Sequence, residues 1–197
     1  MSLKNVNLKL QKENEMVEFN PVQTSPFDKK TKIKLHLWHL INITLFRWTF
    51  FFMRKYRVFL LRLFGAKIDW TCSIDRTVTI DGPWFLTMGK LSSLGENAWL
   101  RCRAPVTIGE KCCIGKDVCI MTGSHKLSSP RFELITDPVT IGDCVWIATR
   151  SFVHKGTCIG DGAVVSACAV VSGNIEPWSV VGGNPAKFIK KRELKDA

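Results

Sequence analysis

An aliphatic residue recurs at every sixth position through much of this chain, and this period restricts the fold more than any other feature. An amphipathic helix has a period near 3.6 residues and an alternating strand a period of 2. A six-residue period instead predicts a solenoid of short strands and tight corners. Six consecutive hits fall in one phase, at Ile141, Ile147, Val153, Ile159, Val165 and Val171. A second series runs two residues ahead, at Val139, Val145, Ser151, Thr157, Ala163 and Ala169.

The same spacing occurs upstream, so the repeat is not confined to the C-terminal half. Upstream hits lie at Ile74, Ile80, Leu86, Leu94, Leu100, Ile108, Ile114 and Ile120. Small residues often follow the aliphatic one and permit a tight corner. Three hexapeptides would close one coil, so the span from Ile74 to Val171 is sufficient for about five coils. A sandwich of short strands would show irregular spacing. We therefore expect a mainly β protein, a parallel β-helix of hexapeptide repeats.

The length of 197 residues fits one domain, and changes in composition mark extensions at its two ends. Residues 1–24 are a polar tail, and residues 25–66 are a basic, aromatic segment that we expect to be helical. The repeats occupy residues 67–181, with a loop at residues 121–138 that interrupts their phase. Residues 182–197 form a basic C-terminal extension.

Residues 33–64 place aromatic and aliphatic side chains between lysines and arginines. A helix that spans a membrane needs about 20 predominantly apolar residues, and this stretch has no such run. We therefore expect amphipathic helices that end near Gly65. These helices either pack against the rest of the protein or lie on an anionic membrane surface. The formal net charge of +11 favours an anionic partner. No recognised nucleic-acid module is present, so nucleic acid is not the expected partner.

The eight cysteines show no CxxC pair and no Cys/His spacing typical of a zinc site. The first residues are polar and lack the apolar region of a secretory signal. We therefore expect a cytoplasmic protein, peripheral on the inner membrane face if the helices bind lipid. Its cysteines are expected to be reduced and buried, with no bound metal.

The loop that interrupts the repeat carries a candidate catalytic residue. His125 directly follows Thr122, Gly123 and Ser124, between Ile120 and the next phase of the repeat. Insertions in solenoids become surface loops and often carry function. A polar loop histidine is either solvated or a general base, and the loop alone does not decide between these interpretations.

Several motifs together resemble the hexapeptide-repeat O-acetyltransferases, which include galactoside, maltose and nodulation-factor acetyltransferases. These motifs are the hexapeptide array, the TGSH loop, the segment PVTIGDCVWIA and the terminal GGNPAKFIKKR. The segments LFRWTF and LLRLFGAKI resemble the colanic-acid and exopolysaccharide biosynthesis branch, and the resemblance covers residues 30–192. It implies a left-handed coil and a homotrimer with active sites between neighbouring subunits. It also implies transfer of acetyl from acetyl-CoA to a saccharide hydroxyl, on an exopolysaccharide or lipid-linked sugar precursor.

The resemblance assigns roles on the donor side of the reaction. His125 would be the general base for direct attack by the acceptor hydroxyl. Backbone amides near Ala148 and Thr149 would stabilise the oxyanion. The remaining residues would contact CoA along the prism edge or bind its phosphates with cationic side chains. They are Trp146, Ala167, Ser172, Lys187 and Lys190.

The acceptor side departs from the galactoside-type pattern, because the matching stretch here reads WLRCRAPVTIG with a shorter connection before Pro105. Arg101 and Arg103 are candidates to bind an anionic or nucleotide-linked acceptor. Cys119 offers a rival mechanism as a thiolate nucleophile, although a packing role is favoured. His154 is expected at the surface or an interface rather than as a second base.

Two other functions stay open at this point. The first is an N-acyltransferase that acts on an amino sugar or an antibiotic. The second is a non-catalytic β-helix scaffold held at the membrane by residues 33–64. A basic tail and a loop histidine favour the O-acetyltransferase over the scaffold.

Overall fold

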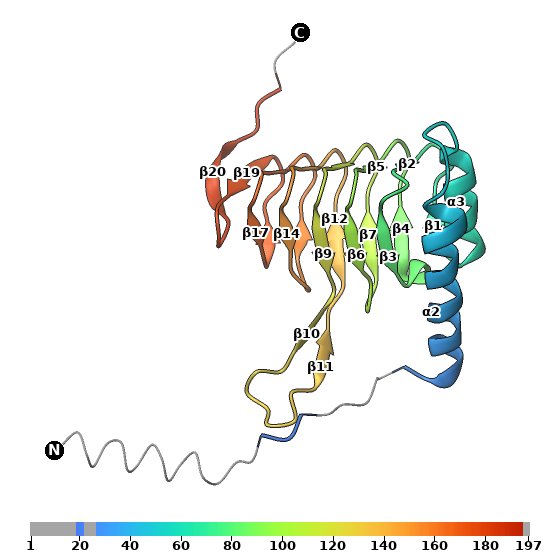
Figure 1. Ribbon diagram of the computed structural model, residues 1–197. Coiled ribbons are helices and arrows are strands. Elements are labelled where there is room, and N and C mark those ends of the chain that lie inside the picture. Colours follow the sequence, from blue (N-terminus) through green and yellow to red (C-terminus); the bar gives the residue numbers. More distant parts are fainter. Residues whose placement is uncertain (1–18, 22–26, 195–197) are drawn as a thin grey trace, which may run out of the picture. The chain divides into compact units, whose positions relative to one another are not determined.

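The computed structural model describes residues 19–21 and 27–194, and most of the polar tail expected at residues 1–24 lies outside them. Residues 27–123 and 136–194 belong to one compact unit, and residues 19–21 and 124–135 to another. The larger unit is a left-handed parallel β-helix with helices at its N-terminal end (Figure 1). The predicted fold class is therefore confirmed.

Three parallel sheets form the faces of the β-helix, and each coil adds one strand to each face. The first sheet contains β1 (Lys67–Ile68), β4 (Leu86–Met88), β7 (Val106–Ile108), β12 (Val139–Ile141), β15 (Cys158–Ile159) and β18 (Asn174–Ile175). The second contains β2 (Ser73–Ile74), β5 (Ser93–Leu94), β8 (Cys113–Ile114), β13 (Trp146–Ile147), β16 (Val164–Val165), β19 (Ser179–Gly182) and β20 (Lys187–Lys191). The third contains β3 (Thr79–Asp81), β6 (Trp99–Arg101), β9 (Cys119–Met121), β14 (Phe152–Val153) and β17 (Val170–Val171).

The number of coils exceeds the sequence-based expectation. The first sheet has six strands, whereas about five coils were expected from the span between Ile74 and Val171. The difference arises because the first coil begins at β1, before Ile74, and the last coil, with β18 and β19, follows Val171. The terminal strand β20 differs from all the others in these sheets, because it pairs antiparallel with β19.

The core of the β-helix consists of the two aliphatic series, whose members are buried throughout. Ser151 and Thr157 are the polar members of the second series, and both are buried. The Ser151 hydroxyl lies 2.8 Å from the carbonyl oxygen of Ala148 and 2.9 Å from that of Ser166. A buried hydroxyl is tolerated when it has such a partner, which explains why the series accepts serine at this position.

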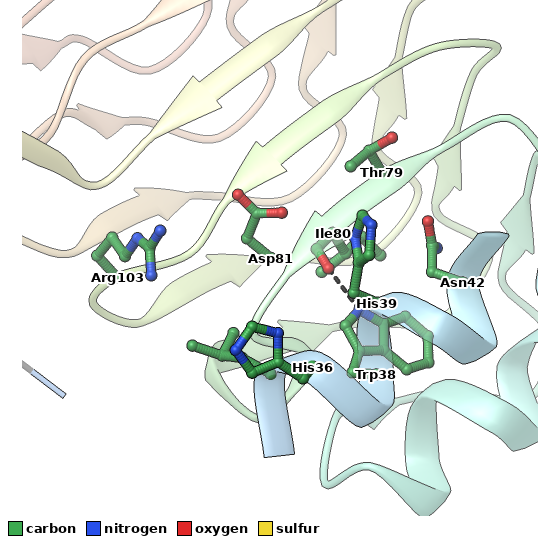
Figure 2. A pocket seen from close by; sticks show the side chains of 9 residues that line it. His36, Trp38, His39, Asn42, Thr79, Ile80, Asp81 and Arg103 are labelled. Atoms are coloured by element: carbon green, nitrogen blue, oxygen red, sulfur yellow. Dashed lines mark hydrogen bonds between the residues drawn. The ribbon is translucent and has the colours of Figure 1, made fainter. Parts of the chain in front are cut away.

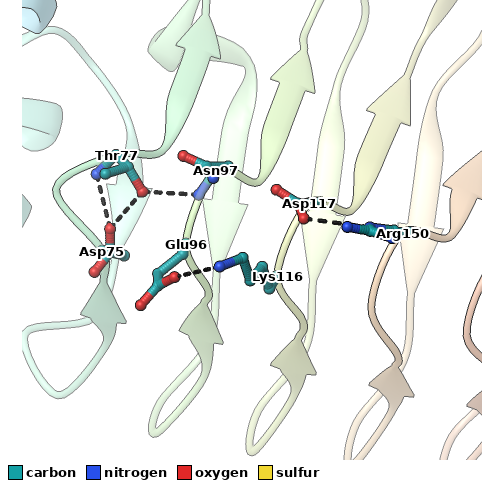
Figure 3. Close-up of polar contacts among 7 residues, drawn as sticks. All are labelled: Asp75, Thr77, Glu96, Asn97, Lys116, Asp117 and Arg150. Carbon is teal, nitrogen blue, oxygen red and sulfur yellow. Dashed lines mark hydrogen bonds and ion pairs between the residues drawn. The ribbon is translucent and has the colours of Figure 1, made fainter.

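Polar side chains at the corners tie one coil to the next (Figure 3). The Asp75 carboxylate accepts hydrogen bonds from the backbone amide and the hydroxyl of Thr77, at 2.8 and 2.6 Å. The same hydroxyl oxygen accepts from the amide of Asn97 on the next coil at 2.8 Å. Lys116 and Glu96 form an ion pair at 2.9 Å, and Arg150 pairs with Asp117 at 3.6 Å. Because these side chains are mostly exposed, the two ion pairs add little to the stability of the fold, and the backbone ladder dominates.

The expectation that all the cysteines are buried is wrong. Three are buried, namely Cys72, Cys102 and Cys112. The others are exposed or half-buried, namely Cys113, Cys119, Cys144, Cys158 and Cys168. Side chains alternate along a strand, so the cysteines that directly precede the inward-facing Ile114 and Ile159 point outward. All eight thiols are free in this chain.

Helices cover the first coil of the β-helix (Figure 1). They are α2 (Lys29–Ile41), a short π-helix η1 (Asn42–Phe46), α3 (Arg54–Leu63) and a 3-10 turn η2 (Pro83–Phe85). Helix α2 is capped by Asp28, whose carboxylate accepts from the amide of Thr31 at 3.1 Å. Helix α3 ends before Gly65, which adopts a φ of 96°. No helix in the described ranges has the length and apolar character needed to cross a membrane.

Two side chains from the helical segment anchor it to the β-helix. The Trp38 indole packs against Phe46 and Phe64 and donates to the carbonyl oxygen of Ile80 at 2.6 Å. The buried Arg57 guanidinium donates to the carbonyl oxygen of Ile74 at 2.6 Å. The helices therefore pack on the first coil, as one of the two interpretations of residues 33–64 proposed.

Candidate active site

The loop histidine lies on a short hairpin with a defined ring orientation. The hairpin consists of β10 (Gly123–His125) and β11 (Leu134–Thr136). His125 Nδ1 lies 2.8 Å from the carbonyl oxygen of Phe132, and the side chain is exposed. A carbonyl oxygen only accepts hydrogen bonds, so Nδ1 must carry the proton in this contact. The neutral ring then presents an unprotonated Nε2, which is the atom that a general base uses.

Phe132 holds this histidine through its ring as well as its carbonyl group. The two rings are stacked, with centroids 4.4 Å apart and an angle of 2° between their planes. Phe132 has a φ of 49°, a left-handed conformation that costs energy for a residue with a side chain. Such strain often persists where it serves a site. Sequence patterns did not single out Phe132, because nothing in them reveals a positive φ.

The two ends of the loop are fixed within the β-helix. The buried Thr122 hydroxyl oxygen accepts from the amides of Arg103 and Ala104, at 2.7 and 2.9 Å. The carbonyl oxygen of Thr122 accepts from the amide of Asp137 at 3.0 Å, and Asp137 forms an ion pair with Lys155. Thr122 is thus the structural member of the TGSH motif. The motif indicated the position of Thr122 but not this role.

Trp146 and Lys190 belong to one row of paired residues across the second sheet. Trp146 pairs with Val164, Val164 with Val180, and Val180 with Lys190. Paired residues project on the same face, and neighbouring strands lie about 4.8 Å apart, so the row spans about 14 Å. Trp146 and Lys190 are exposed at its two ends. The face between them is therefore an extended strip with an aromatic ring at one end and a cation at the other.

The corner that follows this sheet carries Ala148, Thr149 and Ala167. Thr149 and Ala167 are 18 residues apart, which is one coil, so they occupy equivalent corner positions. The amide of Ala148 already donates to the carbonyl oxygen of Val165 at 2.8 Å. The amide of Thr149 has no hydrogen-bond acceptor within the part of the chain that the structure describes. Of the two amides, Thr149 is the one free to bind an oxyanion.

The basic extension contains two kinds of cation. Lys187 and Lys190 project from β20 and are exposed. Arg192 instead donates to the carbonyl oxygens of Cys144 and Gly162, both at 2.9 Å. It therefore fastens the extension to the β-helix, whereas the two lysines are available to a ligand. Ser172 follows β17 of the third sheet, so it lies at a different corner from Thr149 and Ala167.

The two arginines of the acceptor hypothesis do not line the same pocket, although the charge of Arg101 acts on Arg103. Arg101 is exposed on β6 and lies beside the Trp99 ring, at 5.8 Å. Arg103 lines a polar pocket of about 200 Å³ with His36, His39 and Asp81 (Figure 2). Burial, and then the charge of Arg101, lower the pKa of the Arg103 guanidinium. A partly desolvated cation favours an anionic group nearby. The histidines come from α2, and the sequence offered no signal that α2 would meet the end of β3.

The rival residues occupy positions less suited to catalysis. Cys119 is half-buried on β9, in register between Trp99 and Phe152. Burial raises the pKa of the Cys119 thiol, which reduces the reactive thiolate. His154 is exposed and packs beside Phe152, with ring centroids 4.8 Å apart. Over the described residues, no group of three or more His, Cys, Asp and Glu side chains is arranged to hold a metal ion.

Known proteins resemble this chain in sequence and in fold. The acetyltransferase WcaF of Escherichia coli K12, assigned to colanic acid biosynthesis, is 39% identical over 160 residues, covering 81% of this chain and 88% of WcaF. The hexapeptide-repeat acetyltransferase VCA0836 of Vibrio cholerae, solved with acetyl coenzyme A, has a TM-score of 0.77 at 24% identity, covering 92% of this chain and 99% of that one. Galactoside acetyltransferase, solved with coenzyme A, has a TM-score of 0.77 at 20% identity, and each chain is covered to 86%. No protein-family model matches the chain.

The two structural matches support the β-helix fold, and the match to WcaF identifies the relatives in sequence. The motifs that suggested the resemblance lie on the strands, corners and hairpin described above. This chain belongs to the hexapeptide-repeat acetyltransferases, in the branch that contains the colanic acid biosynthesis acetyltransferase WcaF.

Proposed function

We propose that the protein transfers the acetyl group of acetyl-CoA to a hydroxyl of a saccharide, with His125 as the general base. The observation that carries this proposal is the contact between His125 Nδ1 and the Phe132 carbonyl oxygen, at 2.8 Å. It leaves Nε2 as a proton acceptor on an exposed ring. The structures with bound coenzyme A and the name of WcaF support the donor and the saccharide class.

The reaction proceeds by direct transfer. His125 Nε2 removes the proton of the acceptor hydroxyl as its oxygen attacks the thioester carbonyl carbon. The amide of Thr149 stabilises the negative charge on the carbonyl oxygen. The carbon–sulfur bond then breaks, and the imidazolium returns its proton to the leaving thiolate. The products are a sugar acetate ester and CoA with a free thiol, and no acyl-enzyme forms.

Acetyl-CoA lies along the strip from Trp146 to Lys190 in this proposal. The strip of about 14 Å suits an extended arm such as pantetheine, because it follows successive strands at their regular spacing. Trp146, Ala167 and Ser172 contact the organic part of the cofactor. Lys187 and Lys190 bind its phosphates, since cationic donors bind phosphate oxygens strongly. By the same resemblance the protein is a homotrimer, which light scattering of the purified protein would measure.

Lys190→Glu should weaken acetyl-CoA binding about tenfold or more, because it replaces a phosphate-binding cation with an anion. The dissociation constant would be measured by calorimetry, and single-turnover kinetics would follow the chemical step, which should change little. Lys111→Glu is a matched control, because Lys111 is exposed on the β-helix and lies outside the strip. If Lys190→Glu altered only the apparent affinity for the acceptor, the placement of CoA would be wrong.

The polar pocket beside α2 is the proposed acceptor site, and Arg103 is its cation. Arg103→Ala should raise the acceptor KM about tenfold, the loss expected for one charge-assisted hydrogen bond, with the acetyl-CoA KM unchanged. Arg101→Ala is the matched control, because Arg101 does not line the pocket. If Arg101→Ala raised the acceptor KM more than Arg103→Ala did, the acceptor site would instead lie on the outer face of β6.

Product analysis tests the proposed function as a whole. Purified protein would be incubated with acetyl-CoA and a panel of neutral, acidic and amino sugars, and release of the free thiol recorded. Mild alkali cleaves an O-acetyl ester and leaves an amide intact, so it separates an O-acetyltransferase from an N-acyltransferase. Failure to bind acetyl-CoA even at millimolar concentration would support the scaffold instead.

A further inference from the structure

We propose that the protein docks on a bilayer of anionic phospholipids through an aromatic surface at the N-terminal end of the β-helix. This surface consists of Leu45, Trp48, Phe50, Phe51 and Phe52, all exposed. It follows α2 and precedes α3, at the end of the stack that begins with β1 (Figure 1). The inference goes beyond acetyl transfer and does not depend on it.

The exposure of these rings is unusual for a folded chain in water. The Trp48 side chain is 84% exposed and that of Phe51 is 85% exposed. Phe50 and Phe52 are stacked at 5.6 Å, and Phe51 meets Phe52 edge to face at 5.5 Å. Contiguous exposed apolar patches of this kind mark sites of interaction with proteins or membranes. An apolar hollow of about 590 Å³, lined by Leu45, Trp48 and Tyr56 among others, continues the surface.

Buried hydrogen bonds hold the segment that presents the rings. The Arg57 guanidinium donates to the carbonyl oxygens of Phe50 and Phe51, at 2.9 and 3.3 Å, and to the Thr49 hydroxyl at 2.8 Å. It also donates to Ile74 in the first coil. The aromatic segment is therefore tied to the β-helix by its backbone while its rings face solvent. Ordering a segment in the conformation that binds reduces the entropic cost of binding.

Charge determines which partner fits. No aspartate or glutamate occurs between Asp28 and Asp69, whereas ten lysines and arginines do. Arg54 and Lys55 are exposed directly after the aromatic segment. Aromatic rings beside basic side chains are typical of proteins that bind the interface of anionic membranes, where each cation near the surface adds to the attraction. A second copy of this chain placed with the same surface against this one would bring its basic side chains against these and be repelled there, so lipid is the better occupant of this surface.

Vesicle co-flotation of the full-length protein tests the proposal. The protein should float with vesicles of phosphatidylcholine and phosphatidylglycerol, and much less with phosphatidylcholine alone. Binding should weaken as salt is raised, because surface charges are screened. Failure to float with the anionic vesicles would overturn the proposal.

Matched variants identify the surface. The double variant Trp48→Ser, Phe51→Ser should partition at least about tenfold more weakly, because each ring that enters the interface contributes apolar area. Leu91→Ser, Leu194→Ser is its control, since both leucines are exposed elsewhere. Arg54→Glu, Lys55→Glu should also lose at least about tenfold on anionic vesicles, unlike Lys90→Glu, Lys111→Glu. Equal losses in test and control variants would reject a specific surface.

A protein partner gives a different pattern. If the wild type stayed off vesicles and Trp48→Ser, Phe51→Ser lowered its mass in light scattering, the surface would join copies of the chain, and the proposal would be wrong. Acetyl transfer to a water-soluble acceptor should persist in the double variant, because neither residue belongs to the proposed catalytic or binding machinery. Failure of membrane docking and failure of the proposed function are therefore distinguishable.

Discussion

Replacement of His125 by alanine should lower turnover at least about 100-fold, the low end of what a general base contributes. The acceptor hydroxyl would then have to lose its proton to water while it attacks the thioester. Acetyl-CoA binding should stay near its wild-type value, because the proposed contacts with CoA lie on the β-helix and its extension. Steady-state kinetics gives the turnover, and calorimetry with acetyl-CoA gives the binding.

Two other substitutions make this result specific. His154→Ala removes an exposed histidine from the β-helix and should leave turnover within about twofold, as expected for a surface change. Cys119→Ala tests the rival thiolate, and we expect it to be nearly as active as the wild type because burial raises the pKa of that thiol. Near-normal turnover of His125→Ala would refute its role. Loss of turnover in Cys119→Ala, with an acetylated enzyme in the wild type, would favour a covalent mechanism.

The β-helix was predictable because its repeat is local and repeated many times. One inward aliphatic residue per hexapeptide sets the face of every strand, so the core positions followed from the phase alone. The error over the cysteines shows the limit of this argument. Cys113 and Cys158 sit one residue before Ile114 and Ile159, so the same phase places them outside. Residue type suggested burial, and position in the repeat overrode it.

The site was less predictable, because its contacts depend on backbone details. The motif located His125 but not Phe132, whose left-handed backbone conformation accompanies the contact of its carbonyl oxygen with the imidazole. Resemblance named both Ala148 and Thr149 as oxyanion donors. Only the hydrogen bond from Ala148 to Val165 shows that the first amide is occupied. Whether an amide is free or occupied depends on its contacts with the neighbouring coil, about 18 residues away. The hydrophobic periodicity does not describe these contacts.

The helical segment is held by contacts between residues that are even farther apart in the sequence. Replacement of Trp38 tests these contacts most directly. Trp38→Ala should lower the free energy of unfolding by about 3–5 kcal/mol, the range for removing a large buried aromatic side chain. The side chain is 2% exposed and packs against Phe46 and Phe64. Its indole also donates to Ile80, 42 residues away. Urea unfolding followed by circular dichroism would measure the loss.

A milder substitution separates packing from the hydrogen bond if the alanine variant does not fold. Trp38→Phe keeps a ring but leaves the buried Ile80 carbonyl oxygen without its indole donor, so a loss of about 1–3 kcal/mol is expected. Trp48→Ala is the matched control, because that indole is 84% exposed, and its effect should stay within about 0.5 kcal/mol. Equal effects at Trp38 and Trp48 would mean that the helices do not stabilise the first coil. The contrast between two tryptophans ten residues apart therefore separates the part of this segment that anchors it to the β-helix from the part proposed to meet the membrane.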